Sequence, residues 1–233
     1  MKNTILDKTK LVNSVFSTVY KKYDLMNDLM SLGAHRTWKE KFIDWMKPHG
    51  SSNLIDVASG TGDIARLFSL RTNGSHVTCV EPNKEMFNEG KSKLRKYNNI
   101  KWINSSAERI PENNNMYDFY SISFGIRNVS NIDYTLREAL RLLKPGGRFM
   151  CLEFSKVNNE LLNFIYEQYS KAIPYIGKIV IGSEKPYDYL VESIKKFYNQ
   201  DELSEILKKN GFSDVAYRNL SNGVCAIHSG WKI

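Results

Sequence analysis

Two glycines and an acidic residue form the pattern with the clearest chemical meaning in this sequence. Gly60 and Gly62 follow an apolar run at residues 53–58 and precede a helical pattern that starts at Asp63. Glycines at such a turn let the backbone bend tightly and let a ligand approach it closely. Glu81 ends the next apolar run, 21 residues after Gly60, where a carboxylate can accept hydrogen bonds from both hydroxyls of a ribose. The pattern predicts a pocket for an adenosine-type ligand.

The same turn suits two classes of cofactor. Residues 60–65 read G-T-G-D-I-A, which satisfies the dinucleotide pattern G-x-G-x-x-G/A. A dinucleotide needs a second mononucleotide-binding half, whereas this chain ends in a predicted strand hairpin around Asn222 and Gly223. Asp63 would also repel a pyrophosphate, while S-adenosylmethionine has no phosphate and carries a sulfonium cation. The sequence favours S-adenosylmethionine and leaves a nicotinamide cofactor as the alternative.

Strand and helix patterns alternate along most of the chain. Short apolar runs predict strands at residues 53–58, 76–80, 100–104, 117–124, 148–154, 213–220 and 224–228. Apolar residues at helical spacing predict helices at residues 34–47, 63–70, 84–97, 132–143, 158–171 and 186–209. This order is typical of a doubly wound α/β fold with a parallel sheet, whose ligands bind beyond the carboxyl ends of the strands. We therefore expect the functional residues just after the strands.

Length and composition describe an ordinary globular chain. Of its 233 residues, 42% are apolar and 25% are charged, which excludes an intrinsically disordered protein. The three cysteines lie far apart, which excludes a disulfide scaffold and a cysteine-based zinc site and suits a reducing cytosol. No apolar run is long enough to span a bilayer. The first residues lack both a hydrophobic core and arginine, so we expect no secretory signal, no mitochondrial transit peptide and a cytoplasmic location.

The net charge is +8, from 33 basic and 25 acidic residues. Residues 1–47 hold nine Lys or Arg and five Asp or Glu, so half of the excess lies there. No block of five like charges occurs, and nucleic acid is therefore not favoured as a partner. The excess is compatible with a solvated lysine-rich surface and with an anionic membrane surface.

Six longer stretches resemble one family, the ubiquinone/menaquinone-biosynthesis C-methyltransferases. They are VFSTVYKKYDLMNDLMSLGAHRTWK at 15–39, LIDVASGTGDIA at 54–65, ISFGIRNV at 122–129, LKPGGRFMCLEFSK at 143–156, PYDYLVESIKKFYNQ at 186–200 and GVCAIHSGWK at 223–232. The resemblance implies the class I methyltransferase fold. This is a Rossmann-like, doubly wound α/β fold with a mostly parallel seven-stranded sheet and an antiparallel last strand.

The resemblance also implies the cofactor and its contacts. S-adenosylmethionine would be bound without a metal ion, at residues Gly60, Thr61, Gly62, Glu81, Ser106, Ala107 and Ser123. Ser59 stands where the family usually has glycine, and it is tolerated if its backbone is not left-handed. Glu81 stands where aspartate is frequent and keeps the carboxylate.

The implied reaction is transfer of a methyl group to a ring carbon of a polyprenyl quinol. Arg127 and Asn128 follow the fourth predicted strand and are the candidate catalytic residues. Arg127 keeps its proton, so we expect it to stabilise charge on a ring oxygen or to hold a water molecule, rather than to act as a base. The alternative for Arg127 is an ion pair with a surface acid.

The N-terminal region is predicted to cover the site. Residues 1–47 form a helical lid segment in this interpretation, and Tyr23 and His35 within it are candidates for contact with the substrate. Residues 48–233 form the methyltransferase domain, with a helical insertion on the substrate side around 157–199.

Eight aromatic residues between positions 164 and 198 predict either an apolar groove for an isoprenoid tail or ordinary helix packing. With the net charge of +8, they lead us to expect peripheral contact with the inner face of the membrane. A homodimer and an association with other quinone-biosynthesis enzymes are both compatible with the sequence. The functional alternatives are a methyltransferase of another small lipid or metabolite, a nicotinamide-dependent reductase, and a non-catalytic assembly subunit that keeps the pocket.

Overall fold

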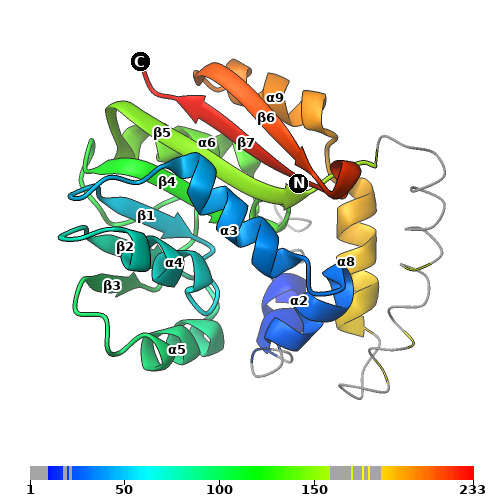
Figure 1. The fold of residues 1–233 in the computed structure, drawn as a ribbon. Helices are drawn as coiled ribbons and strands as arrows, with labels where there is room; N and C mark the ends of the chain where they lie inside the picture. Colours follow the sequence, from blue (N-terminus) through cyan, green and yellow to red (C-terminus); the bar gives the residue numbers. More distant parts are fainter. Residues whose placement is uncertain are drawn as a thin grey trace.

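A seven-stranded sheet forms the centre of the protein (Figure 1). The computed structural model describes residues 10–17, 20, 23–157, 169, 175, 178 and 185–233, apart from the side chains of residues 23 and 24. The strands are β1 (Leu54–Val57), β2 (Val77–Val80), β3 (Ile100–Ile103), β4 (Tyr117–Ser123), β5 (Leu143–Phe154), β6 (Ser213–Leu220) and β7 (Cys225–Trp231). Their order is β3-β2-β1-β4-β5-β7-β6. The first five are parallel, and β7 is antiparallel to both β5 and β6, which confirms the predicted sheet.

Helices cover both faces of this sheet, as expected for a doubly wound fold. The main helices are α2 (Tyr23–Ser31), α3 (His35–Met46), α4 (Asp63–Arg71), α5 (Lys84–Lys93), α6 (Ile132–Leu142), α8 (Lys185–Lys196) and α9 (Gln200–Lys209). Phe42 of α3 and Phe68 of α4 belong to the core on one face, and Leu136 of α6 and Leu207 of α9 to the core on the other. Packing on both faces fixes the positions of the central strands, and therefore of the loops that follow their carboxyl ends.

The turn from β1 to α4 has the conformation that its glycines allow. Gly60 and Gly62 have φ values of 57° and 86°, in the left-handed region. A Cβ at Gly62 would lie 2.5 Å from Cδ1 of Leu94, so this glycine also permits close packing against the end of α5. Ala58, with a φ of 52°, takes the left-handed conformation, and Ser59 does not. The departure from glycine at Ser59 therefore costs no backbone strain.

The structure corrects two predicted elements. The helix predicted at 186–209 is two helices, because Asn199 begins α9 with a capping box in which it exchanges hydrogen bonds with Glu202. The strand predicted from Arg148 begins five residues earlier, at Leu143, which pairs with Tyr117 before the register shifts. The helix predicted at 158–171 lies outside the described residues, except for position 169.

Candidate active site

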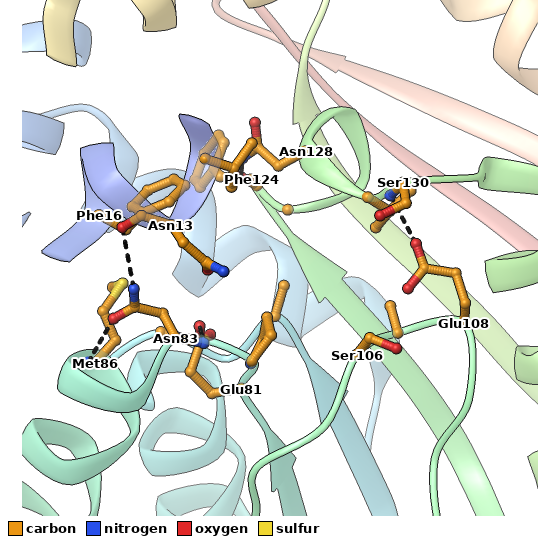
Figure 2. A pocket seen from close by; sticks show the side chains of 17 residues that line it. Asn13, Phe16, Glu81, Asn83, Met86, Ser106, Glu108, Phe124, Asn128 and Ser130 are labelled. Atoms are coloured by element: carbon orange, nitrogen blue, oxygen red, sulfur yellow. Dashed lines mark hydrogen bonds between the residues drawn. The ribbon is translucent and has the colours of Figure 1, made fainter. Parts of the chain in front are cut away.

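A pocket of about 740 Å³, counting the space at its open mouth, lies beyond the carboxyl ends of β1, β2 and β4 (Figure 2). Its walls combine apolar side chains with a few polar groups. The lining residues are Val12, Asn13, Phe16, Ala58, Gly60, Glu81, Pro82, Asn83, Met86, Ser106, Ala107, Glu108, Phe124, Gly125, Asn128, Val129 and Ser130. The structure thus brings together five of the residues predicted for the site, namely Gly60, Glu81, Ser106, Ala107 and Asn128.

Glu81 is the buried carboxyl group of this pocket, with only 5% of its surface exposed. Its Oε2 accepts a hydrogen bond from the backbone N–H of Gly60 at 2.8 Å, and its Oε1 accepts one from the N–H of Asn83 at 2.9 Å. Burial raises the pKa of Glu81 to about 7, although both hydrogen bonds oppose this shift. The two bonds fix the carboxyl group and leave each oxygen a second lone pair for a ligand.

The loop between β4 and α6 closes the opposite wall. Glu108, which follows β3, accepts hydrogen bonds from the backbone N–H groups of Ser130 at 2.6 Å and Asn131 at 3.2 Å. Figure 2 shows Glu108 reaching Ser130 on the side of the pocket opposite Glu81. Ser106 and Ala107 lie next to Glu108 and are therefore held at the pocket wall.

A second, smaller pocket of about 320 Å³, again counting the space at its open mouth, adjoins the first, and Ala58 and Phe124 line both. It contains Thr61 and Ser123, the two other predicted side-chain contacts. Asp56 forms its buried end, where Oδ1 accepts a hydrogen bond from Ser121 at 2.6 Å. Among the described residues, Oδ2 of Asp56 and Oγ of Ser123 are buried without a hydrogen-bond partner. Burial raises the pKa of Asp56 to about 7.

Arg127 is buried and does not line either pocket, although its neighbour Asn128 lines the first. It forms a buried ion pair with Glu153 at the end of β5, and its Nη1 donates to the carbonyl of Phe124 at 2.9 Å. Only 4% of the Arg127 side chain and 1% of the Glu153 side chain are exposed, so the predicted pairing with an acid exists but is not at the surface. Asn128 does line the pocket, and its Oδ1 accepts a hydrogen bond from the Tyr189 hydroxyl at 2.8 Å.

The N-terminal helix at residues 10–17 covers one side of the first pocket. Nδ2 of Asn83 donates to the carbonyl of Asn13 at 3.3 Å and to the hydroxyl of Ser17 at 3.0 Å. Figure 2 shows Asn13 and Phe16 facing Asn83 and Glu81 across the pocket. These contacts place part of the predicted lid segment directly over the site.

His35 and Tyr23 are not placed in the pocket. His35 is buried and lines neither of the two pockets. Its Nε2 lies 2.8 Å from Oδ1 of Asp28, and this contact joins α3 to α2. Burial lowers the pKa of His35, with the Lys39 charge acting in the same direction. The side chain of Tyr23 lies outside the described residues.

Residues 3–232 match the sequence profile of the ubiE/COQ5 methyltransferase family. The chain belongs to this family. It is 50% identical to the ubiquinone/menaquinone biosynthesis C-methyltransferase UbiE of Rickettsia bellii, over 97% of this chain and 94% of the relative. It is 46% identical to the enzyme of the same name from Brucella canis, over 97% and 87% of the two chains. A solved methyltransferase from Thermotoga maritima shares the fold, with a TM-score of 0.68, 17% identity and coverage of 95% of this chain and all of that one.

Membership of the ubiE/COQ5 family makes the chain an S-adenosylmethionine-dependent C-methyltransferase, which sets aside the reductase and the non-catalytic subunit. The expectation that Asp63 would repel a pyrophosphate was nevertheless wrong. Asp63 lies 2.7 Å from Nζ of Lys39 and 3.6 Å from Nζ of Lys93, so its charge is largely balanced and would not repel a pyrophosphate strongly. Among the described residues, the antiparallel strands β7 and β6 continue the sheet beside β5, where a second mononucleotide-binding half would add parallel strands.

Three charged residues were not predicted from the sequence. Lys39 and Asp56 line the second pocket, and Glu153 pairs with Arg127. Asp56 and Glu153 each interrupt an apolar strand, and a charged residue in a buried strand was the available signal. Lys39 gave no such signal, because a lysine on an amphipathic helix is ordinarily solvated. No group of three or more potential metal ligands occurs in the described part of the chain.

Proposed function

We propose that this enzyme methylates a ring carbon of a polyprenyl quinol in ubiquinone or menaquinone biosynthesis. The observation that carries the proposal is the 46–50% identity, over nearly the whole chain, to enzymes named for this step. The two joined pockets at the carboxyl edge of the sheet are consistent with it, because they offer room for a methyl donor beside an apolar acceptor.

The first pocket fits the adenosyl part of S-adenosylmethionine. Glu81 would accept hydrogen bonds from the ribose hydroxyls, and Gly60 lets the sugar approach the backbone. Ser106 and Ala107 would lie along the adenine edge, where a hydroxyl and backbone groups can bond to it. Phe16 and Met86 supply apolar surface for the base.

The second pocket fits the methionine end of the same cofactor. The buried oxygen atoms of Asp56 and Ser123 that have no partner among the described residues would gain one from the amino group. Thr61 would add a hydroxyl at the wall. When bound, S-adenosylmethionine would supply an electrophilic methyl group on its sulfonium, and Phe124 lines both of the pockets that would hold it.

The affinity for the cofactor product S-adenosylhomocysteine should fall as the pH decreases from about 8 to about 6, by up to about tenfold per pH unit for each group involved. The pKa values of Glu81 and Asp56 are raised to about 7, so both lose their negative charge over this range, and the charged forms are the ones that bind hydroxyls and the ammonium group. Titration calorimetry at several pH values measures the effect. Adenosine, which lacks the amino-acid end, isolates Glu81, and a flat profile for both ligands would contradict the assignment.

On the acceptor side, Asn128 and the Arg127–Glu153 pair lie next to Phe124. The Tyr189 hydroxyl fixes the Asn128 amide, which can then donate to a ring oxygen. The Arg127 charge would stabilise the negative charge that develops on that oxygen as the ring hydroxyl gives its proton to water. The ring carbon would then take the methyl group, S-adenosylhomocysteine would leave, and the ring carbon's own proton would pass to the solvent as the oxygen is protonated again. Holding the ring carbon and the methyl group in line at about 3–3.5 Å contributes up to roughly 7–11 kcal/mol.

The division of the chain into a lid at 1–47 and a catalytic domain from 48 onward stays a proposal, and the structure suggests a narrower lid. Helix α3 packs its Trp38, Phe42 and Ile43 side chains into the core beside the sheet. The helix at 10–17 contacts the pocket mainly through hydrogen bonds and a few side chains. We assign the covering role to the residues before α3.

Access to a polyprenyl quinol favours peripheral membrane binding. No helix among the described residues is long and apolar enough to cross a bilayer. Leu25 in α2 and Leu32 just after it are 41% and 78% exposed, and Arg36 near the start of α3 is also exposed. Of the aromatic residues predicted to form a groove, Tyr187 and Phe197 are core residues instead. Cosedimentation with anionic phosphatidylglycerol vesicles at low salt is expected, and equal binding to neutral vesicles would contradict an electrostatic contribution.

The function is tested with purified enzyme, S-adenosylmethionine carrying a labelled methyl group, and the reduced forms of demethylmenaquinone and of the unmethylated ubiquinone precursor. The expected product has the label on a ring carbon, which mass spectrometry of the extracted quinone shows. Transfer to neither quinol, with transfer to another small metabolite, would favour the alternative methyltransferase.

A further inference from the structure

Lys39 is a buried cation in the second pocket that the function proposed above does not use. It belongs to α3, and its side chain is only 7% exposed. Its Nζ lies 2.7 Å from Oδ2 of Asp63 and, with Asp63, forms part of the pocket wall. Burying an ammonium group is costly, so its position at a pocket wall calls for an explanation.

The contact with Asp63 leaves Lys39 able to donate further hydrogen bonds. An ammonium group has three donors, and the contact with Asp63 uses one of them. Asp63 is itself shared, because Nζ of Lys93 lies 3.6 Å from its other oxygen. Asp63 is thus shared between two lysines, so it does not belong to Lys39 alone.

The same pocket also holds buried oxygen atoms that can accept hydrogen bonds. Oδ2 of Asp56 and Oγ of Ser123 are buried there without a partner among the described residues. A pocket with a cation on one wall and a carboxyl group with a free oxygen on another matches a zwitterion, in which an ammonium and a carboxylate stand on the same carbon atom. The amino-acid end of the methyl donor has this arrangement.

We propose that Lys39 binds the α-carboxylate of the methyl donor and makes the enzyme selective for donors that carry it. The inference rests on the proposed function, which places the amino-acid end in the second pocket. Asp63 acts as the positioning residue, because its contact holds the ammonium group at the wall without consuming its remaining donors. The selectivity-determining cation then comes from α3, ahead of the glycine turn, so residues before position 47 contribute to the cofactor site as well as to its cover.

Two ligands that differ only in the carboxylate test this directly: S-adenosylmethionine and decarboxylated S-adenosylmethionine. Calorimetry with the full chain should show that the wild type binds S-adenosylmethionine about 10- to 100-fold more tightly, as expected for a charge-assisted contact. Lys39→Met should lose most of this preference, by weakening S-adenosylmethionine binding about 10- to 100-fold while the Kd of the decarboxylated ligand changes less than about threefold. Lys39→Arg should restore part of the preference.

Lys93→Gln is the matched control, because Lys93 also faces Asp63 but does not line the pocket as described. It should leave the preference unchanged. Equal weakening of both ligands in Lys39→Met, or no weakening of either, would overturn the proposal. If Lys39→Met fails to fold, the wild-type protein still tests the proposal. Equal affinities of the wild type for S-adenosylmethionine and its decarboxylated form would also overturn it. Wild-type protein that binds neither ligand would instead refute the proposed function.

Discussion

Replacing Arg127 with alanine is expected to lower the free energy of unfolding by about 3–5 kcal/mol and to abolish methyl transfer. The substitution leaves the Glu153 carboxylate, with 1% of its side chain exposed, without its buried counter-charge. It also removes the shorter of two side-chain hydrogen bonds to the carbonyl of Phe124, a residue that lines both pockets. Burial raises the pKa of Glu153, so protonation relieves the lost pairing at low pH, and the destabilisation should grow as the pH rises.

Urea unfolding and labelled methyl transfer measure the two effects separately. The double variant Arg127→Met with Glu153→Leu removes both charges and keeps most of the volume, so we expect most of the stability to return while transfer stays absent. Unchanged unfolding of Arg127→Ala would show that the ion pair is not needed to hold the fold. Normal turnover of the double variant would refute the electrostatic role of Arg127.

Replacing Glu81 with alanine is expected to raise the Kd for S-adenosylhomocysteine by at least about 100-fold. Two ribose hydroxyls lose a charged acceptor, and such hydrogen bonds contribute about 1.5–3 kcal/mol each. The N–H groups of Gly60 and Asn83 also lose their partner, so the loop that approaches the ligand is less firmly held. Calorimetry measures the affinity, and a melting curve shows whether the variant stays folded.

Glu81→Asp is the conservative control for this experiment. It keeps a carboxylate one methylene further from the ribose, and we expect its Kd to stay within about tenfold of the wild-type value. A Glu81→Ala variant that binds S-adenosylhomocysteine as the wild type does would remove Glu81 from the cofactor site. A large loss in Glu81→Asp as well would mean that the length of the side chain, and not only its charge, is selected in this chain.

The mostly parallel sheet and a pocket at its carboxyl edge were predictable because both follow from local patterns. Apolar runs that alternate with helical periods require a parallel sheet, and a parallel sheet presents its ligand site at the carboxyl edge. The glycine turn at 60–62 and Glu81 were found for this reason. The errors were local as well: the break before Asn199 depends on a capping box, and the extension of β5 to Leu143 depends on its pairing with Tyr117.

Residue types and their order in the chain were enough to indicate a doubly wound sheet, an adenosine-type pocket and, through the resemblance, a methyltransferase. The fold alone revealed the charge arrangement, because each pair joins residues far apart in sequence: Arg127 with Glu153, and Lys39 with Asp63. Burial destabilises the charged form of a group unless a counter-charge or hydrogen-bond partner packs against it. Those partners come from distant parts of the chain, so no local sequence pattern identifies them. Lys39 looks solvated in the sequence, and only the packing around it shows that it is buried at the wall of a pocket.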